Sequence, residues 1–255
     1  MPKLSKENEK KLEELASLLT KSKGTAAMTG AGASVESGIP DFRGKGGLWS
    51  RYDPEEYATI FAFQEDPKKV WKMLAELIVT VEAADPNPGH IALAQLESMG
   101  MLEGIITQNV DGLHQRAGSK NVFEYHGNCR SLKCDKCFKR YTDVHMYKKQ
   151  SPPLCSCGAP LRPDVVLFDE QIPGAVQREA KELASRCELM LVIGTSAVVV
   201  PAAYLPYMTK ANNGKLIEIN TEGTALTQDA DISIFGESGT ILPALLKIIK
   251  SRVDI

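Results

Sequence analysis

A glycine-rich stretch near the N-terminus, at residues 29–43, constrains the fold more than any other part of the sequence. It follows a short apolar run at residues 25–28 and reads TGAGASVESGIPDFR. The missing Cβ atoms of Gly30 and Gly32 allow a tight turn and let a phosphate group approach the backbone. A strand that ends in such a turn is typical of nucleotide-binding α/β proteins, although a plain glycine turn at a strand end is the alternative.

The rest of the common dinucleotide-binding signature is missing. No third glycine follows Gly32 at the required spacing, and residues 37–43 have the composition of a loop. This pattern disfavours a Rossmann enzyme that transfers a hydride. The loop ends in Asp41, Phe42 and Arg43. We expect it to fold over a bound nucleotide, with Phe42 covering a reactive carbon and Arg43 pairing with phosphate.

Length and charge limit the classes of protein to consider. A chain of 255 residues can form one large domain with a smaller partner. Its 30 basic and 32 acidic side chains give a net charge of -2, which is not the electrostatic pattern of a nucleic-acid-binding protein. The charged segment at residues 1–11 lacks the apolar core of a signal peptide or membrane span. We therefore expect a cytoplasmic protein that binds neither nucleic acid nor a membrane.

Helical and strand-like apolar patterns alternate along most of the chain. Helices are expected at residues 5–21, 90–99, 174–185 and near the C-terminus, and strands at 25–28, 104–107, 122–125, 189–193, 215–219 and 231–235. This order predicts a Rossmann-like parallel sheet with helices on both faces, which binds its ligands beyond the carboxyl ends of the strands. Asn109, His126 and Asn220 follow such strand ends.

Four of the six cysteines form two closely spaced pairs, Cys134 with Cys137 and Cys155 with Cys157. Two thiolate pairs can close a tetrahedron around Zn²⁺, and four protein ligands leave no open position, so we expect one structural zinc ion. The second pair is CxC rather than CxxC. Cys129 or His145 could therefore replace one ligand, and unligated thiols are the alternative to a metal site.

Together these motifs resemble those of the sirtuins, the NAD-dependent protein lysine deacylases. The resemblance runs from about Gly24 to the C-terminal helix and rests on GAGAS, GIPDFR, TQNVDGLH, the pair His126-Gly127, the cysteine pairs, RPDVVLF and GTSAVVVPAA, in that order. It implies a large NAD-binding domain at residues 1–44, 90–128 and 162–255. A small domain at residues 45–89 and 129–161 would combine a helical insertion with a zinc ribbon, and NAD and an acyl-lysine peptide would meet between the two.

The resemblance also implies roles for individual residues. His126 would be the general base, and Asn109 would contact the nicotinamide ribose or a bound water. The residues implied to contact NAD are Gly30, Ala31, Gly32, Ser34, Asp41, Phe42, Arg43, Gln108, Asn109, Val110, Asp111, Gly194, Thr195, Ser196, Asn220, Thr221, Glu222 and Ser238. Those implied to contact the acyl-lysine substrate are Val165, Leu167, Phe168, Val198 and Val199.

The implied reaction suits these residue types. The amide oxygen of the acyl-lysine attacks the ribose C1′ as nicotinamide leaves, which depends on positioning. A base then activates the ribose 2′-hydroxyl, and an imidazole with a pKa near ~6.5 can do this at neutral pH. The products are free lysine and an O-acyl-ADP-ribose. His126 could instead merely cap a strand, and His90, His114, Trp49 and Trp71 are interpreted as structural.

Two departures from the family pattern bear on the substrate. Phe168-Asp169-Glu170 stands where sirtuins usually have Phe-Gly-Glu, so a carboxylate is added beside the peptide-binding segment. Sirtuins that prefer acidic acyl groups have a Tyr and an Arg at places that hold Leu74 and Leu77 here. An apolar pair cannot neutralise a buried carboxylate, so we expect acetyl-lysine or longer aliphatic acyl-lysine to be accepted and succinyl-lysine to be rejected.

Two other functions are compatible with parts of the sequence. A protein ADP-ribosyltransferase or NAD hydrolase would cleave the same glycosidic bond but needs no base for the 2′-hydroxyl, so His126 favours deacylation. A zinc-ribbon nucleic-acid module is disfavoured by the near-neutral charge. We expect a monomer that acts on acyl-lysine proteins or peptides.

Overall fold

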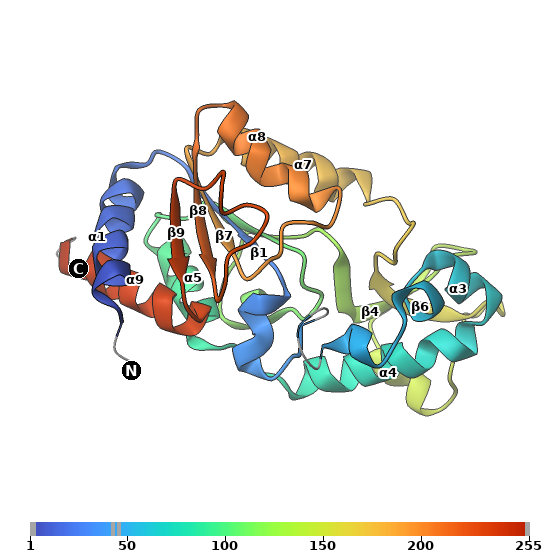
Figure 1. Ribbon diagram of the computed structural model, residues 1–255. Helices are drawn as coiled ribbons and strands as arrows, with labels where there is room; N and C mark the ends of the chain where they lie inside the picture. Colours follow the sequence, from blue (N-terminus) through green and yellow to red (C-terminus); the bar gives the residue numbers. More distant parts are fainter. Residues whose placement is uncertain (1–3, 42–43, 45–46, 253–255) are drawn as a thin grey trace.

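The computed structural model describes residues 4–41, 44 and 47–252. Its centre is a parallel six-stranded sheet in the order β3-β2-β1-β7-β8-β9 (Figure 1). The strands are β1 (Thr25–Thr29), β2 (Gly104–Thr107), β3 (Val122–Glu124), β7 (Leu189–Ile193), β8 (Lys215–Asn220) and β9 (Ile232–Phe235). Every residue of β1, β2 and β7 is buried. Their continuous apolar runs are what a parallel sheet covered on both faces requires, and the predicted fold class is confirmed.

Helices cover both faces of this sheet (Figure 1). On one face α1 (Lys6–Lys21), α5 (Pro88–Ser98) and α9 (Ser238–Arg252) bury their apolar sides against Ile105 and Leu191. On the other face α7 (Gly174–Arg186) and α8 (Leu205–Ala211) pack on Met28 and Ile106. Neighbouring strand residues thus enter opposite cores, as the two-residue period of a strand demands.

A second, three-stranded antiparallel sheet has the order β5-β4-β6. Its strands are β4 (Gly127–Cys134), β5 (Arg140–Tyr141) and β6 (Leu161–Val165). The short helices α2 (Pro54–Tyr57) and α3 (Ile60–Glu65) and the long helix α4 (Pro67–Ala83) share a core with it. Trp71 is fully buried there and donates from Nε1 to the Leu161 carbonyl at 2.7 Å. This separate core supports the two-domain division expected above, whose boundaries stay a prediction.

The remaining elements are short and lie mostly at strand ends. They are the 3₁₀ segments η1 (Ala31–Ser37), η2 (Leu48–Ser50), η3 (Val144–Lys148) and η4 (Ala202–Tyr204) and the helix α6 (Leu113–Arg116). Two segments differ from expectation by more than one residue. The chain coils directly after Gly30 instead of forming only a loop, and α5 begins at Pro88 because the Asn87 side chain caps its first backbone N–H groups. No helix in the described ranges is long and apolar enough to cross a membrane.

Candidate active site

A cavity of about 730 Å³ lies at the carboxyl ends of the parallel strands and reaches the second sheet. One wall contains Gly30–Gly32 after β1, Gln108–Val110 after β2, Gly194–Ser196 after β7 and Asn220–Ala225 at the end of β8. The opposite wall contains Leu48, Trp49, Met73, Leu74, Leu77 and Val165–Glu170. Polar groups from one layer therefore face a mostly apolar lining from the other, to which Asp169 and Glu170 add two carboxylates.

The two glycine turns of this cavity interlock. Gly30 donates its N–H to the Ile193 carbonyl at 3.0 Å, and Gly32 donates to the Gly194 carbonyl at 2.8 Å. A Cβ atom on Gly32 would lie 2.8 Å from the Gly194 Cα, and one on Gly194 would lie 2.3 Å from the Ala33 nitrogen. The glycines are thus required by the contact between the turns after β1 and β7, a reason that the phosphate argument from sequence missed.

A buried network behind the cavity wall fixes the amide of Asn109. Its Nδ2 donates to the Gly30 carbonyl and to Ser34 Oγ, both at 3.0 Å. Ser34 in turn donates to Asp111 Oδ2 at 2.7 Å, and Asp111 Oδ1 accepts the Leu113 N–H at 2.9 Å. Asn109 lines the cavity, whereas Ser34 and Asp111 lie behind it. Both Asn109 bonds use Nδ2, so Oδ1 is left to accept from a ligand.

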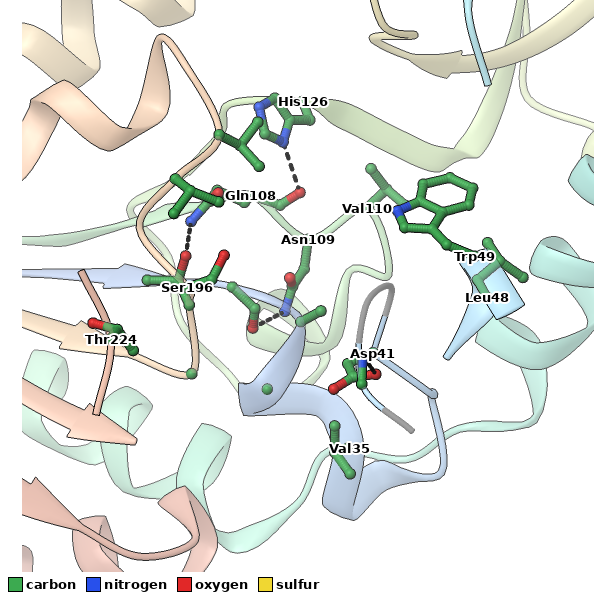
Figure 2. A pocket seen from close by; sticks show the side chains of 18 of the residues that line it. Val35, Asp41, Leu48, Trp49, Gln108, Asn109, Val110, His126, Ser196 and Thr224 are labelled. Carbon is green, nitrogen blue, oxygen red and sulfur yellow. Dashed lines mark hydrogen bonds between the residues drawn. The ribbon is translucent and has the colours of Figure 1, made fainter. Parts of the chain in front are cut away.

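His126 lies between β3 and β4 and lines the same cavity as Gly30 and Gly32 (Figure 2). Its Nδ1 is 3.1 Å from the Gln108 carbonyl oxygen, which can only accept, so the neutral ring carries its proton on Nδ1 and keeps Nε2 as a free base. Burial lowers the pKa of His126, and the Gln108 carbonyl partly opposes that shift.

The far end of the cavity is shaped by a loop at residues 221–225. Asn220 donates from Nδ2 to the Thr195 carbonyl at 3.0 Å and accepts the Thr221 N–H at 2.9 Å. Beneath the loop Glu218 is only 1% exposed. Its carboxylate accepts from the hydroxyls of Thr224, of Thr227 at 2.8 Å and of Ser233 at 2.8 Å.

The end of the cavity nearer the second sheet is apolar. Leu74 and Leu77 both line it, and the rings of Trp49 and Phe168 lie 6.1 Å apart. Leu48 belongs to the core of the second sheet, Trp49 and Val110 pack against that core, and Figure 2 shows Leu48 and Trp49 on one side of the cavity. Among the described residues that line the cavity there is no lysine or arginine. Trp49 therefore has two roles: it packs against the core of the second sheet, as its structural interpretation predicted, and it also belongs to the cavity wall.

Four sulfur atoms converge in the second sheet. The Sγ atoms of Cys134, Cys137, Cys155 and Cys157 all lie within 4.8 Å of one another. The two proposed substitute ligands lie outside this cluster: Cys129 is buried, with its pKa raised to about 12 chiefly by burial, and His145 pairs with Glu82 at 3.4 Å. Four converging thiols with no further ligand fit a structural zinc ion.

Other predicted site residues can be placed individually. Asp41, Ser238 and the five predicted substrate residues all line the cavity, whereas Phe42 and Arg43 lie outside the described residues. His90 and His114 are buried against each other with ring centroids 4.8 Å apart, away from the cavity wall, as their structural interpretation predicted.

Some residues of the site were not singled out from sequence. Glu36 and Trp49 line the cavity, and Glu218 supports its loop. Only Glu218 carried a readable signal, because a carboxylate inside the apolar strand sequence LIEIN needs buried partners. Trp49 stands in a short 3₁₀ turn without helical or strand periodicity.

Comparison with known proteins agrees with this geometry. The sequence profile of the Sir2 family matches residues 30–201. The chain belongs to the Sir2 family. A Sir2 relative named NAD-dependent protein deacylase 2, from Pyrobaculum aerophilum, is 49% identical over 94% of this chain and 96% of its own length. Another, NAD-dependent protein deacylase from Pyrococcus furiosus, is 48% identical over 94% and 98%.

Solved Sir2 structures are similar throughout. One, a mutant Sir2 homologue in complex with ADP-ribose, superposes with a TM-score of 0.92 at 45% identity and covers 95% of this chain and 98% of that one. A Sir2 homologue in complex with NAD has a TM-score of 0.89 at 46% identity and covers 94% of both chains. A Sir2 complex with a p53 peptide and NAD⁺ has a TM-score of 0.86 at 38% identity and covers 92% and 97%.

Proposed function

We propose that this chain is an NAD-dependent protein deacylase that removes acetyl and other aliphatic acyl groups from protein lysines. The products are nicotinamide, O-acyl-ADP-ribose and free lysine. One observation carries the proposal: a single cavity joins interlocked glycine turns, an imidazole with a free Nε2, and an apolar end that can take an acyl chain. The names of the relatives, and the NAD, ADP-ribose and peptide in the similar structures, support it.

The residues present fit NAD. The backbone at Ala31, Thr195 and Ser196 would hold the phosphates, and Asn220 with its following loop would hold the adenosine ribose. Bound NAD supplies an electrophilic ribose C1′ with nicotinamide as the leaving group. Oδ1 of Asn109 would accept from a ribose hydroxyl or a water, because the Asn109 Nδ2 is already held by Gly30 and Ser34.

His126 would act as the base that accepts the proton of the ribose 2′-hydroxyl. The Gln108 carbonyl fixes its proton on Nδ1 and directs its basic Nε2 to the reaction. Because burial lowers its pKa, the ring is mostly neutral at pH 7 and available as a base. Its catalytic contribution should be lost as the pH falls through that lowered pKa.

The four clustered cysteines would hold one zinc ion in a structural role. Cys134 and Cys137 flank the turn after β4, and Cys155 and Cys157 lie in a loop before β6. The ion would therefore hold two segments of the small sheet together, and it takes no part in the chemistry.

Further parts of the proposal concern the setting of the enzyme. We propose that the protein is a monomer. A net charge of only -2 supports the proposal that it does not bind nucleic acid. The cysteines converge as thiols, which supports a location in the cytoplasm. Light scattering after gel filtration and a salt-dependent DNA-binding assay test these points. A protein ADP-ribosyltransferase or NAD hydrolase is not favoured.

The central test uses an acetyl-lysine peptide with and without NAD. We expect NAD-dependent deacetylation and a mass-spectrometric product at the mass of O-acetyl-ADP-ribose. His126→Ala should lower kcat/KM at least about 100-fold, which is the usual contribution of a general base. His145→Ala, a change at a half-exposed histidine outside the cavity, is the control and should keep activity. An ADP-ribosylated peptide or free ADP-ribose alone would contradict the proposal.

A further inference from the structure

Arg162 connects the turn that carries Cys134 and Cys137 to the segment after β6 that lines the cavity. It lies in β6 and is only 1% exposed. Its guanidinium binds Asp135 through two bonds, Nε to Oδ2 at 2.7 Å and Nη2 to Oδ1 at 3.1 Å. Nη1 donates to the Val165 carbonyl at 2.7 Å, and Nη2 also donates to Glu170.

The two carboxylates on either side of Arg162 belong to functional segments. Asp135 stands between Cys134 and Cys137 in the cysteine cluster. Glu170 holds the cavity segment on the other side, because its Oε2 accepts the Leu167 N–H at 2.7 Å. A continuous polar chain thus runs from the cysteine turn through Arg162 to the backbone of Leu167, which lines the cavity.

The burial of Arg162 makes this chain stiff. A buried guanidinium is tolerated only when its donors are paired, and removing one partner leaves an uncompensated charge. The planar fork fixes both carboxylates in relative position, which a lysine ammonium cannot do. The Phe63 ring, 5.7 Å from the guanidinium carbon, covers it from α3. A shift of the cysteine turn must therefore move Glu170 or break the pairing.

We propose that Arg162 is a positioning residue that couples the cysteine cluster to the peptide-binding segment at residues 165–168. The proposal rests on the deacylase function proposed above. Metal held by the four cysteines fixes Asp135, Arg162 then fixes Glu170, and Glu170 presents the backbone of Leu167 and Phe168 to the acyl-lysine peptide. By thermodynamic reciprocity, bound peptide should in turn strengthen the hold on the metal.

The test compares zinc-loaded wild type with Asp135→Asn and Glu170→Gln, which keep side-chain size. Asp135 does not line the cavity. Nevertheless Asp135→Asn should weaken binding of an acetyl-lysine peptide about fivefold or more and raise the KM for that peptide by a matching factor. The KM for NAD and the affinity for ADP-ribose should stay unchanged. The double variant should lose little more than either single variant, because both break one chain. Arg140→Gln removes an exposed side chain that pairs with Asp164 in the same sheet, and this variant should bind peptide as the wild type does.

A second readout needs no catalysis. Release of zinc to a chromogenic chelator should slow severalfold when the peptide is added to wild type, and this protection should disappear in Asp135→Asn and Glu170→Gln. Equal peptide affinity in Asp135→Asn and wild type, or equal protection of zinc in both, would overturn the coupling alone. A wild type that binds no acyl peptide would overturn the deacylase function, and the coupling with it.

Discussion

Asp169 adopts a backbone conformation that favours glycine. Its φ is +65°, which is costly for a residue with a Cβ atom although aspartate tolerates it better than most. Sirtuins usually have glycine at this place. This chain therefore carries a residue with a Cβ atom where the backbone conformation favours glycine. The side chain also adds a carboxylate to the cavity wall.

We expect Asp169→Gly to raise the free energy of unfolding by about 0.5 kcal/mol, because relief of the strained φ outweighs the added freedom of the unfolded chain. Urea unfolding measures this. Asp169→Asn separates charge from backbone: it should keep the stability of wild type but raise the KM for peptides with basic flanks. Equal KM values for basic-flanked and acidic-flanked peptides in wild type and Asp169→Asn would show that the carboxylate does not act on the substrate.

The leucines at the apolar end of the cavity should decide which acyl groups are accepted. Leu74 and Leu77 line it, and no described lysine or arginine does. An unpaired carboxylate there would lose its hydration without compensation. We expect kcat/KM for a succinyl-lysine peptide to be at least about 100-fold below that for an acetyl-lysine peptide. A butyryl-lysine peptide, of similar chain length but uncharged, should be accepted and is the control. Equal turnover of succinyl and acetyl peptides would refute this prediction.

At the scale of single elements, strand β8 supports the loop at residues 221–225 through one carboxylate. Glu218 accepts three hydroxyl hydrogen bonds, and one donor, Thr224, lines the cavity. Hydrogen bonds to a charged group contribute about 1.5–3 kcal/mol each. The loop at residues 221–225 therefore depends on a residue that has no place in the cavity wall.

We expect Glu218→Gln to raise the KM for NAD about tenfold or more, since loss of one hydrogen bond to a charged group costs about 1.5–3 kcal/mol, while kcat changes less than twofold. Thr209→Val is the matched control: Thr209 is fully buried in α8 and donates to the Ala184 carbonyl at 2.7 Å, away from the cavity. It should lose stability without changing the KM for NAD. A Glu218→Gln enzyme with the wild-type KM would exclude this support role.

The elements differ in how far sequence could predict them. Buried strands such as β7 have continuous apolar runs, and Asn109 and His126 follow strand ends, so their meeting at one sheet edge followed from parallel topology. Trp49 could not be found in this way. Its position depends on how the chain between β1 and α4 folds back over the cavity, and neither a helical nor a strand period encodes that path.

At the scale of the whole molecule, two buried histidines make the fold sensitive to acid. Burial lowers the pKa of His90 to about 4 and that of His114 to about 3. A histidine in an unfolded chain has a pKa of about 6.5. Both folded-state values are lower, so below about pH 6.5 the unfolded state binds more protons than the folded state. The fold holds both histidines in their neutral forms. The free energy of unfolding therefore falls as the pH drops from about 6.5 towards 4.

Between pH 7 and pH 5 we expect the free energy of unfolding to fall by about 2 kcal/mol for each of these histidines. Urea unfolding of wild type and His114→Gln at several pH values measures this contribution. The variant will be less stable overall, because it loses the bond between His114 Nε2 and Thr29 Oγ1. Its stability should nevertheless depend less on pH. Parallel curves for the two proteins would contradict the prediction.

The backbone contact between Gly32 and Gly194 leaves no room for adjustment, since any side chain at either position would collide with the facing turn. A side chain added at either of these two turns would therefore break the joint between β1 and β7. The opposite wall is built from side chains such as Leu74 and Trp49, whose replacement would change the shape of the cavity without breaking this backbone contact. Variants selected for bulkier acyl groups should accumulate their changes there and leave both turns untouched.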